Sequence, residues 1–258
     1  MNKVDYIKHY LTLYWNDHGF IRFFYKNFHE IDKSVYRSSQ PSPIDIRKLK
    51  KIGIKTIVNL RFVTGAGYYL LEKDACKKHN INIINYPLRS RELPSRDELL
   101  EANEIIKNLD YPCLFHCKSG ADRAGFMSAL YFMYTKNNLQ KAMEQLDFKY
   151  GHIKKSKTGV LDLFFSEYKN FVENRIEVDE PESSQEPMTS KDAYHRARSV
   201  MLKIRRMNSN YEERTIGRTN PSEFIYWVTN HYDKETIQQK HKYSNTLNII
   251  LDFIMRRE

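Results

Sequence analysis

Short apolar runs alternate with stretches of helical periodicity through the first two thirds of the chain. Three runs rich in β-branched or large apolar residues predict buried strands: KTIVNL at 55–60, INIINY at 81–86 and CLFHC at 113–117. An earlier run at 34–40 predicts a short strand that leads to a turn at Pro41. Strands that alternate with helices predict an α/β fold, with a central and mostly parallel sheet flanked by helices.

Helices are predicted between these strands and after the last of them. Ser42 and Ser95 stand where helix N-caps are expected, and Gly53 follows the first helix, as helix-ending glycines commonly do. In a sheet of this kind ligands bind at the carboxyl ends of the strands, which places a site directly after residue 117. The segments with helical spacing are 44–51, 69–78, 94–109, 125–135, 139–148 and 159–175.

Residues 1–33 form a segment crowded with aromatic side chains. Tyr6, Tyr10 and Tyr14 recur at four-residue spacing, and a polar stretch that ends at Gly19 interrupts the pattern, so a pair of short helices is predicted. These helices either pack on the core of the domain, which we favour, or use aromatic and basic residues to contact a membrane surface or a protein partner.

Composition divides the rest of the chain into three parts. Residues 34–176 contain the alternating strands and helices, residues 177–190 are acidic and typical of a linker, and residues 191–258 predict a helical extension. Apolar residues in the extension favour packing on the central part or on a second copy in a homo-oligomer. Its basic charge suits anionic lipid or nucleic acid, which is the weaker alternative. Helices are predicted there over 193–207, 222–231 and 244–257.

Charge and cysteine content bear on the substrates and the cellular compartment that we expect for this protein. The net charge is +10, and residues 1–176 hold 29 Lys/Arg against 19 Asp/Glu, whereas residues 177–258 hold 13 of each. A basic excess on the folded part steers anionic substrates toward it, although solubility alone also accounts for it. Three cysteines, no secretory leader and no run of 18 apolar residues lead us to expect a cytoplasmic protein that does not span a membrane.

The stretch LFHCKSGADRAG at 114–125 joins the last predicted strand to a helix. Cys117 and Arg123 bracket a Gly-containing loop at a helix N-terminus, where backbone N–H groups and the helix dipole favour negative charge. Such surroundings stabilise a thiolate, and the adjacent His116 can assist. The guanidinium of Arg123 is a planar fork that suits two phosphate oxygens. The loop is therefore predicted to be an oxyanion site with a nucleophile at its floor.

The order His-Cys-x-x-Gly-x-x-Arg resembles the signature loop of cysteine-dependent tyrosine and dual-specificity phosphatases. Upstream, VYRSSQPS and GIKTIVNLR resemble the opening of the atypical dual-specificity branch found in bacteria, fungi and plants, so that the likeness covers residues 34–175. The resemblance implies an α/β phosphatase fold and hydrolysis of phosphate monoesters through a phosphocysteine on Cys117, without a metal or other cofactor. It also implies that Arg123 and the backbone of Lys118, Ser119, Gly120 and Ala121 bind the phosphate.

The chain departs from this family at the residue that protonates the leaving group. Related phosphatases place an Asp on the loop after the strand at 81–86, where this chain has Arg89 and Arg91. The nearest acids in that loop are Glu92 and Asp97. Asp122 is the stronger candidate, because the Gly-x-Asp-Arg order resembles phosphoinositide phosphatases in which a loop acid is proposed to give the proton. Alternatively, Asp122 pairs with a neighbouring base and fixes the loop geometry.

Basic residues around the loop suggest a substrate that carries more than one phosphate. Lys118, directly after the nucleophile, resembles the loop lysines with which tensin-type phosphoinositide phosphatases contact extra phosphates. With Arg89 and Arg91 nearby, a phosphoinositide or inositol phosphate is an expected substrate, and a phosphotyrosine or phosphoserine protein is the other. These arginines can instead be an ordinary solvated rim.

Other functions stay open at this point. Ala124 stands where many relatives carry Ser or Thr to assist phosphoenzyme hydrolysis, so the protein is alternatively a catalytically weak module that binds phosphorylated partners, unless Ser119 compensates. A similar loop on a basic surface serves RNA 5′-triphosphatases, whereas rhodanese-type sulfur transfer fits the Gly-x-x-Arg order less well. Cys113 is expected in the core, and Cys76 is a candidate for a reversible disulfide with Cys117 on oxidation.

Overall fold

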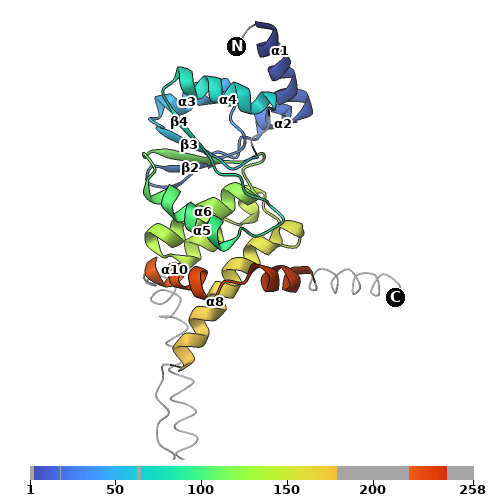
Figure 1. The fold of residues 1–258 in the computed structure, drawn as a ribbon. Coiled ribbons are helices and arrows are strands. Elements are labelled where there is room, and N and C mark those ends of the chain that lie inside the picture. Colours follow the sequence, from blue (N-terminus) through green and yellow to red (C-terminus); the bar gives the residue numbers. More distant parts are fainter. Residues whose placement is uncertain (1–2, 18, 63–64, 179–220, 243–258) are drawn as a thin grey trace, which may run out of the picture.

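The computed structural model describes residues 3–17, 19–62, 65–178 and 221–242. Its core is one five-stranded sheet with the strand order β1-β2-β5-β3-β4, in which β1 and β2 form an antiparallel hairpin and the other pairs are parallel (Figure 1). The predicted α/β fold with a mostly parallel sheet is therefore confirmed. The strands are β1 (His29–Asp32), β2 (Val35–Ser38), β3 (Thr56–Asn59), β4 (Asn82–Asn85) and β5 (Cys113–His116).

The central strand, β5, carries the signature loop out of the sheet at its carboxyl end. All four of its residues are buried, because β2 and β3 flank it and helices cover both faces. His116 is in register with Ser38 of β2 and with Asn59 of β3. The loop that begins at Cys117 therefore leaves the sheet between the ends of two parallel strands.

Helices cover both faces of the sheet and divide the core into two clusters. On one face, α3 (Pro43–Lys51) and α4 (Gly67–Lys78) bury a small cluster. The other face carries the larger cluster and a second layer of helices, as Figure 1 shows below the strands. Residues 124–134 of the central helix in this layer, α6, are all buried, so the helix that follows the loop is firmly anchored. The layer consists of α5 (Arg96–Lys107), α6 (Asp122–Lys136), α7 (Leu139–Glu144) and α8 (Val160–Val178).

The helix starts follow the sequence pattern, whereas two other elements differ from it. Ser42 and Ser95 both form capping boxes, as their positions predicted. The helix predicted over 139–148 ends at Glu144, because the Asp147 side chain accepts a hydrogen bond from the N–H of Lys149 and starts a separate 3-10 turn, η2 (Phe148–Tyr150). Strand β1 was not predicted, since its sequence HEID is mostly polar.

The N-terminal segment is a pair of short helices, as predicted, with a π-helical turn between them. α1 (Lys3–Leu11), η1 (Thr12–Asn16) and α2 (Gly19–Phe24) lie beside α4, and the Tyr6 hydroxyl donates a hydrogen bond of 3.0 Å to Asp74. One face thus packs on the domain. The opposite face leaves Ile7, Leu11 and Trp15 exposed. Contact of this face with a membrane surface or a partner stays a prediction.

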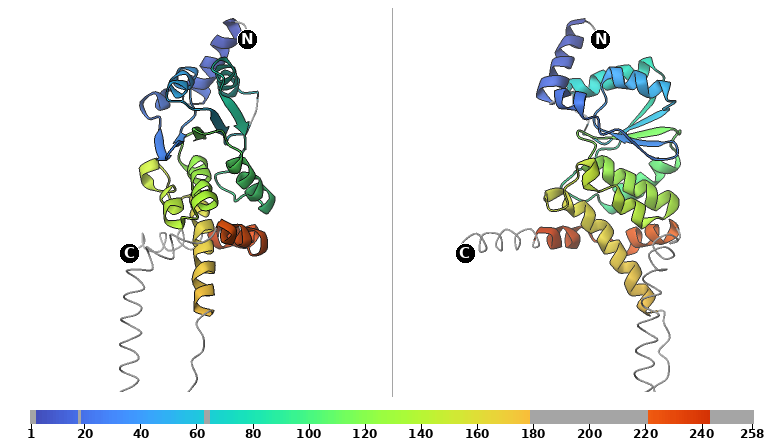
Figure 2. Two further views of the ribbon diagram at one scale, coloured as in Figure 1. Left: turned by 90° about the vertical axis from the view of Figure 1, so that its left-hand side faces the viewer. Right: turned by 180° about the vertical axis from the view of Figure 1, so that it is seen from behind.

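The described part of the C-terminal extension packs on the opposite side of the molecule from α1 (Figure 2). In α10 (Pro221–Asn230), Phe224 and Trp227 are buried, and their rings lie 5.2 Å from Tyr134 of α6 and 5.2 Å from Phe164 of α8, respectively. Residues 234–242 form a further helical stretch that was not predicted. The helices predicted over 193–207 and 244–257 lie outside the described residues. The four-part division of the chain and a homo-oligomer stay predictions.

Across the four described ranges, no helix combines the length and the apolar character that crossing a bilayer requires.

Candidate active site

Residues 117–121 form a tight loop between β5 and α6, with Cys117 at its floor. The Cys117 side chain is almost fully buried, and its Sγ accepts a hydrogen bond of 3.2 Å from the backbone N–H of Gly120. Gly120 has φ +78°, and a Cβ there would lie 2.7 Å from backbone atoms of Ser38 and Ser39. Glycine is therefore required for the loop to curl over the sulfur while it presses on the end of β2.

Arg37 of β2 holds this loop from beneath. The side chain is fully buried, and its Nη2 donates hydrogen bonds to the carbonyl oxygens of Gly120 and Ala121 at 2.7 and 2.8 Å. Its Nη1 donates to the carbonyl of Gln145 at 2.7 Å. Burial lowers the pKa of Arg37 to about 10, so it remains a cation at neutral pH. Because C=O and N–H of a trans peptide point in opposite directions, these bonds turn the N–H groups of Ala121 and Asp122 away from Arg37.

Arg123, in the first turn of α6, is half-buried and uncommitted. Among the residues that the structure describes, none forms a hydrogen bond, ion pair or ring contact with its guanidinium. Arg37 and Arg61, by contrast, use both terminal nitrogens of their guanidinium groups in hydrogen bonds. A free guanidinium beside the N-terminus of a 15-residue helix is suited to bind an anion. That Cys117 and Arg123 act together on one phosphate stays a prediction.

The remaining predicted loop residues shape the rim. The Oγ of Ser119 accepts a hydrogen bond of 3.4 Å from the N–H of Ala121, and its carbonyl accepts one of 3.0 Å from Asn27. Lys118 is partly exposed, with its Nζ 3.6 Å from Asp17. These contacts tie the loop to the segment before β1 and to the N-terminal helices.

His116 begins a buried chain of polar side chains that reaches the N-terminal helices. Its Nε2 lies 2.7 Å from Oε1 of Glu72, although the two atoms are not aligned for a straight hydrogen bond. The other carboxylate oxygen of Glu72 accepts a hydrogen bond of 2.9 Å from Gln40, whose Oε1 accepts one of 2.9 Å from Arg61. Arg61 then donates two hydrogen bonds of 2.8 Å to Asp17.

Asp17 closes this chain as a buried carboxylate among three cations. Arg22 lies 2.7 Å from it, in addition to Arg61 and Lys118. Burial alone would raise the pKa of Asp17, but the hydrogen bond and charge of Arg61, with the charges of Arg22 and Lys118, outweigh it and lower that pKa. The N-terminal helices therefore supply the counter-charge for a residue of the signature loop.

Asp122 is paired with a base, and that base is His152. Nδ1 of His152 lies 2.7 Å from Oδ1 of Asp122, and its Nε2 lies 2.6 Å from Oδ2 of Asp162. The His152 side chain is fully buried between the two carboxylates. Burial alone would lower the pKa of His152, but the hydrogen bonds and charges of Asp122 and Asp162 raise it to about 9. His152 is therefore an imidazolium at neutral pH.

This raised pKa predicts a loss of stability at alkaline pH. The ordinary pKa of histidine is 6.5, so the stabilisation by charged His152 is fully present below pH 6.5 and disappears as the pH rises through about 9. The rise in pKa corresponds to about 3 kcal/mol of unfolding free energy. Urea unfolding of the natural chain and of His152→Gln at pH 6 and pH 9.5 measures it. The difference in unfolding free energy between the two chains should shrink by about 3 kcal/mol at the higher pH. An unchanged difference contradicts the conclusion that His152 is a stabilising imidazolium.

The basic residues predicted at the rim lie on the loop after β4. Arg89 is exposed, 3.4 Å from Glu92 and with its guanidinium 5.6 Å from the centre of the Phe62 ring. Arg91 is exposed as well. Both are thus available to solvent rather than held in the loop that surrounds Cys117.

The two alternative acids of this loop are placed differently from Asp122. Glu92 accepts a hydrogen bond of 2.8 Å from Lys234 of the C-terminal extension, which holds the pKa of that carboxyl below its usual range. Asp97 is exposed in the first turn of α5. Asp122 alone among the three belongs to the signature loop, in the first turn of α6.

The three cysteines are free thiols, and the proposed redox pair is separated by the sheet. Cys76 belongs to the cluster beneath α3 and α4, whereas Cys117 belongs to the cluster on the other face. Burial raises the pKa of Cys76 well above its usual range and that of Cys113 to about 12. These placements argue against a disulfide between Cys76 and Cys117, while Cys113 is in the core as predicted.

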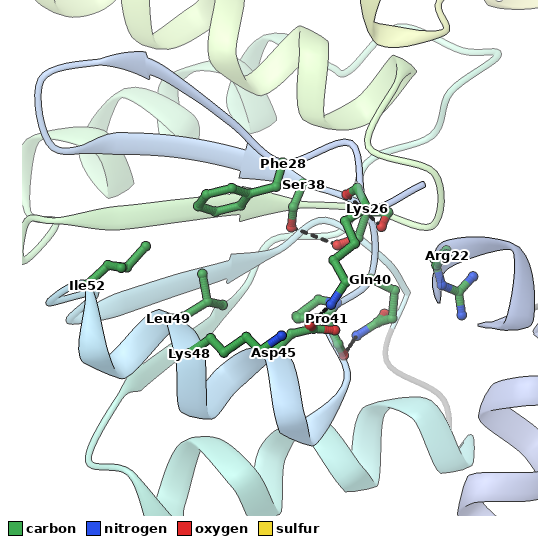
Figure 3. Close-up of a pocket in the computed structure, with 11 residues that line it drawn as sticks. Arg22, Lys26, Phe28, Ser38, Gln40, Pro41, Asp45, Lys48, Leu49 and Ile52 are labelled. Atoms are coloured by element: carbon green, nitrogen blue, oxygen red, sulfur yellow. Dashed lines mark hydrogen bonds and ion pairs between the residues drawn. The ribbon is translucent and has the colours of Figure 1, made fainter. Parts of the chain in front are cut away.

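A pocket of about 270 Å³ lies between α3 and the end of β2 (Figure 3). Its walls include Phe28 and Leu49, and Lys26 reaches across its mouth to pair with Asp45. No residue of the signature loop is among those that line it. The pocket borders the site only through the segment after Ser38 and through Gln40 and Arg22 of the buried polar chain, so it is not where a reacting phosphate would sit.

The supporting residues of the site were missed from the sequence. Arg37, Glu72, Asp17 and His152 act through partners far away in the chain, and such pairs leave no local pattern. One signal was available. Arg37 lies within a predicted strand of the sheet, and a charged residue at such a position indicates a buried polar role.

Comparison with known proteins agrees with this geometry. Residues 26–162 match a family model described as PTP-NADK, a DSP-PTPase phosphatase fused to NAD+ kinase. Among curated proteins, the chain is similar to inositol diphosphatase DSP4 of Arabidopsis thaliana, with 26% identity over 104 residues, or 38% of this chain and 51% of that protein. The chain thus spans about half the length of this curated relative.

Two solved structures are similar to the chain at lower identity. The core catalytic domain of the PP-IP phosphatase SIW14 from S. cerevisiae is 20% identical, with a TM-score of 0.44 over 58% of this chain and 93% of that one. TpbA of P. aeruginosa is 17% identical, with a TM-score of 0.44 over 55% and 84%. The family match covers more than half of the chain and includes Cys117, Arg123 and His152. The protein is therefore a member of the DSP-PTPase family of cysteine-dependent phosphatases.

Proposed function

We propose that this protein hydrolyses phosphate monoesters through a phosphocysteine on Cys117. The observation that carries the proposal is that a buried sulfur, held by the N–H of Gly120, and the uncommitted guanidinium of Arg123 at the start of α6 stand at the two ends of one short segment. A nucleophile and an anion-binding fork on one short loop are what phosphoryl transfer requires.

The reaction takes two steps at the phosphorus. The Cys117 thiolate attacks, the S–P bond forms, and the P–O bond to the leaving group breaks while the leaving oxygen takes a proton. Water then attacks the phosphocysteine, so that inorganic phosphate leaves and the thiolate returns. Arg123 and the N–H groups that Arg37 orients stabilise the charge on the three transferring oxygens.

For the substrate we propose a small molecule with several phosphates, of the inositol phosphate or phosphoinositide type. The exposed cations Lys118, Arg89 and Arg91 support this choice, since further phosphates would meet them at the rim. The name of the Arabidopsis relative, an inositol diphosphatase, supports it as well. A phosphotyrosine or phosphoserine protein is the second candidate, and a common panel of both substrate types separates them.

The mechanism is tested by trapping the intermediate. The natural chain is mixed with 4-nitrophenyl phosphate, quenched in acid within the first turnover and digested for mass spectrometry. We expect one phosphoryl group on the peptide that carries Cys117. Phosphate release with the phosphoryl group on another residue contradicts the mechanism. Tight binding of phosphorylated ligands without any release favours the binding module instead, for which Ala124, buried behind the loop, is the supporting residue.

A further inference from the structure

The Asp122–His152–Asp162 row is a complete hydrogen-bonded unit that the two chemical steps above leave without a role. Each ring nitrogen of His152 meets one carboxylate, at 2.7 Å toward Asp122 and 2.6 Å toward Asp162. The imidazole is fully buried, whereas the Asp122 side chain keeps about a quarter of its surface exposed, at 24%. Asp122 is next to Arg123 in the chain, so the exposed end of the row lies at the phosphate-binding loop.

We propose that His152, held by Asp162, is the positioning residue for the general acid of this phosphatase, and that Asp122 is that acid. The proposal rests on the phosphatase function proposed above and adds the group that controls proton delivery. His152 fixes Oδ1 of Asp122, and among the described residues none forms a hydrogen bond or ion pair with Oδ2. A carboxyl group with one oxygen held and the other open to the loop can transfer a proton from the open oxygen only.

The proton balance follows from this division of the two oxygens. In the reacting form, Asp122 carries a proton on Oδ2 while the Nδ1–H of His152 donates to Oδ1. As the S–P bond forms and the P–O bond breaks, the Oδ2 proton passes to the leaving oxygen and Asp122 becomes a carboxylate. The imidazolium stabilises that new charge. In the second step the attacking water returns a proton to Oδ2, so the row ends as it began.

Other charged groups interact electrostatically with Asp122 and Asp162. Lys154 lies 3.8 Å from Asp162 on the side away from the loop. The charge of Asp162 also acts on His241 of the helical stretch 234–242, and that of Asp122 acts on the buried Arg37. None of these groups lies between His152 and Asp122, which are in direct contact. Removing the imidazole should therefore disturb the placement of Asp122 more than that of any other loop residue.

The experiment compares two substrates. One has a leaving group that must be protonated as it departs, and the other has a leaving group that departs readily without a proton. kcat/KM is measured for phenyl phosphate, whose phenoxide leaves poorly, and for 4-nitrophenyl phosphate, whose phenoxide leaves well. The variants are Asp122→Asn, His152→Gln and Asp162→Asn, with His79→Gln at the end of α4 as a matched histidine control. Each is measured from pH 5 to pH 9, and circular dichroism checks the fold.

We expect Asp122→Asn to lower kcat/KM for phenyl phosphate by about 100-fold and that for 4-nitrophenyl phosphate by far less. His152→Gln and Asp162→Asn should repeat this pattern at about 10-fold, and His152→Gln should also move the alkaline limb of the pH profile. Equal losses for both substrates with an unmoved pH profile would show a merely structural role and overturn the proposal.

Two further outcomes separate this proposal from the function on which it rests. If the natural chain releases no phosphate from either substrate, the proposed function itself fails. If it hydrolyses both substrates and Asp122→Asn leaves phenyl phosphate turnover unchanged, the phosphatase function stands and the assignment of the acid is wrong. Should His152→Gln fail to fold, Asp162→Asn carries the same test, because it removes the charge that orients the imidazole from the far side.

Discussion

A Cys117→Ser variant is expected to release phosphate from 4-nitrophenyl phosphate about 10⁴-fold more slowly than the natural chain, or slower still, because an unionised hydroxyl replaces the nucleophilic sulfur. The fold should persist, since serine fills the same place at the floor of the loop and its oxygen can accept the hydrogen bond from the N–H of Gly120. Initial rates with malachite-green detection of phosphate measure the loss.

Binding should survive this substitution while turnover does not. Arg123 and the loop amides are unchanged in the variant, so inositol hexakisphosphate or a phosphopeptide should bind with an affinity within about tenfold of that of the natural chain. Cys76→Ala is the matched control, because that thiol lies on the other face of the sheet, and it should retain full activity. Turnover by the serine variant above a tenth of the natural rate would contradict nucleophilic attack by Cys117.

Replacing Arg37 with methionine is expected to destabilise the protein and to inactivate it together. The substitution removes the hydrogen bonds that Arg37 donates to the carbonyl oxygens of Gly120, Ala121 and Gln145, of which the Ala121 carbonyl keeps a second donor, the N–H of Gly125. At about 1 kcal/mol for each lost partner, the unfolding free energy should fall by about 3 kcal/mol. Activity should fall further than stability alone explains, because the N–H groups of the loop are no longer held in one direction.

The measurement is urea unfolding together with kcat/KM below the unfolding transition. Arg47→Met is the control, since Arg47 is exposed on α3 and its loss should change the unfolding free energy by less than about 0.5 kcal/mol. Arg37→Lys should recover little, because one ammonium cannot reach the carbonyls on both sides of the loop. An Arg37→Met chain as stable as the Arg47→Met chain would show that the buried guanidinium does not hold the loop.

The sequence was sufficient for those features whose cause is local. The strands at 56–59 and 113–116 follow from β-branched and apolar residues that suit a buried parallel sheet, and the capping boxes at Ser42 and Ser95 follow from a side chain three residues away from its partner. The signature loop belongs to this class too. Cys117 and Arg123 lie six positions apart, so both are recognised as candidates from the order of residues alone.

Features that depend on distant partners were not visible in the same way. From the sequence, Asp122 could be either a proton donor or a structural partner. The choice stayed open because His152, the base that contacts it, lies 30 positions later in an irregular segment. The 234–242 stretch was missed for a related reason. It has few apolar residues, and polar contacts such as that between Lys234 and Glu92 place it against the loop before α5.

The position of Asp17 has a practical consequence for anyone who isolates the catalytic unit. The family match begins at residue 26, and a fragment cut there would look complete by homology. It would nevertheless remove the only carboxylate that the structure places within ion-pair distance of Arg61 and Lys118 among the described residues. Two positive side chains would then face each other at the edge of the phosphate cradle without compensation. A fragment made for functional study is therefore expected to need the N-terminal helices upstream of the family match.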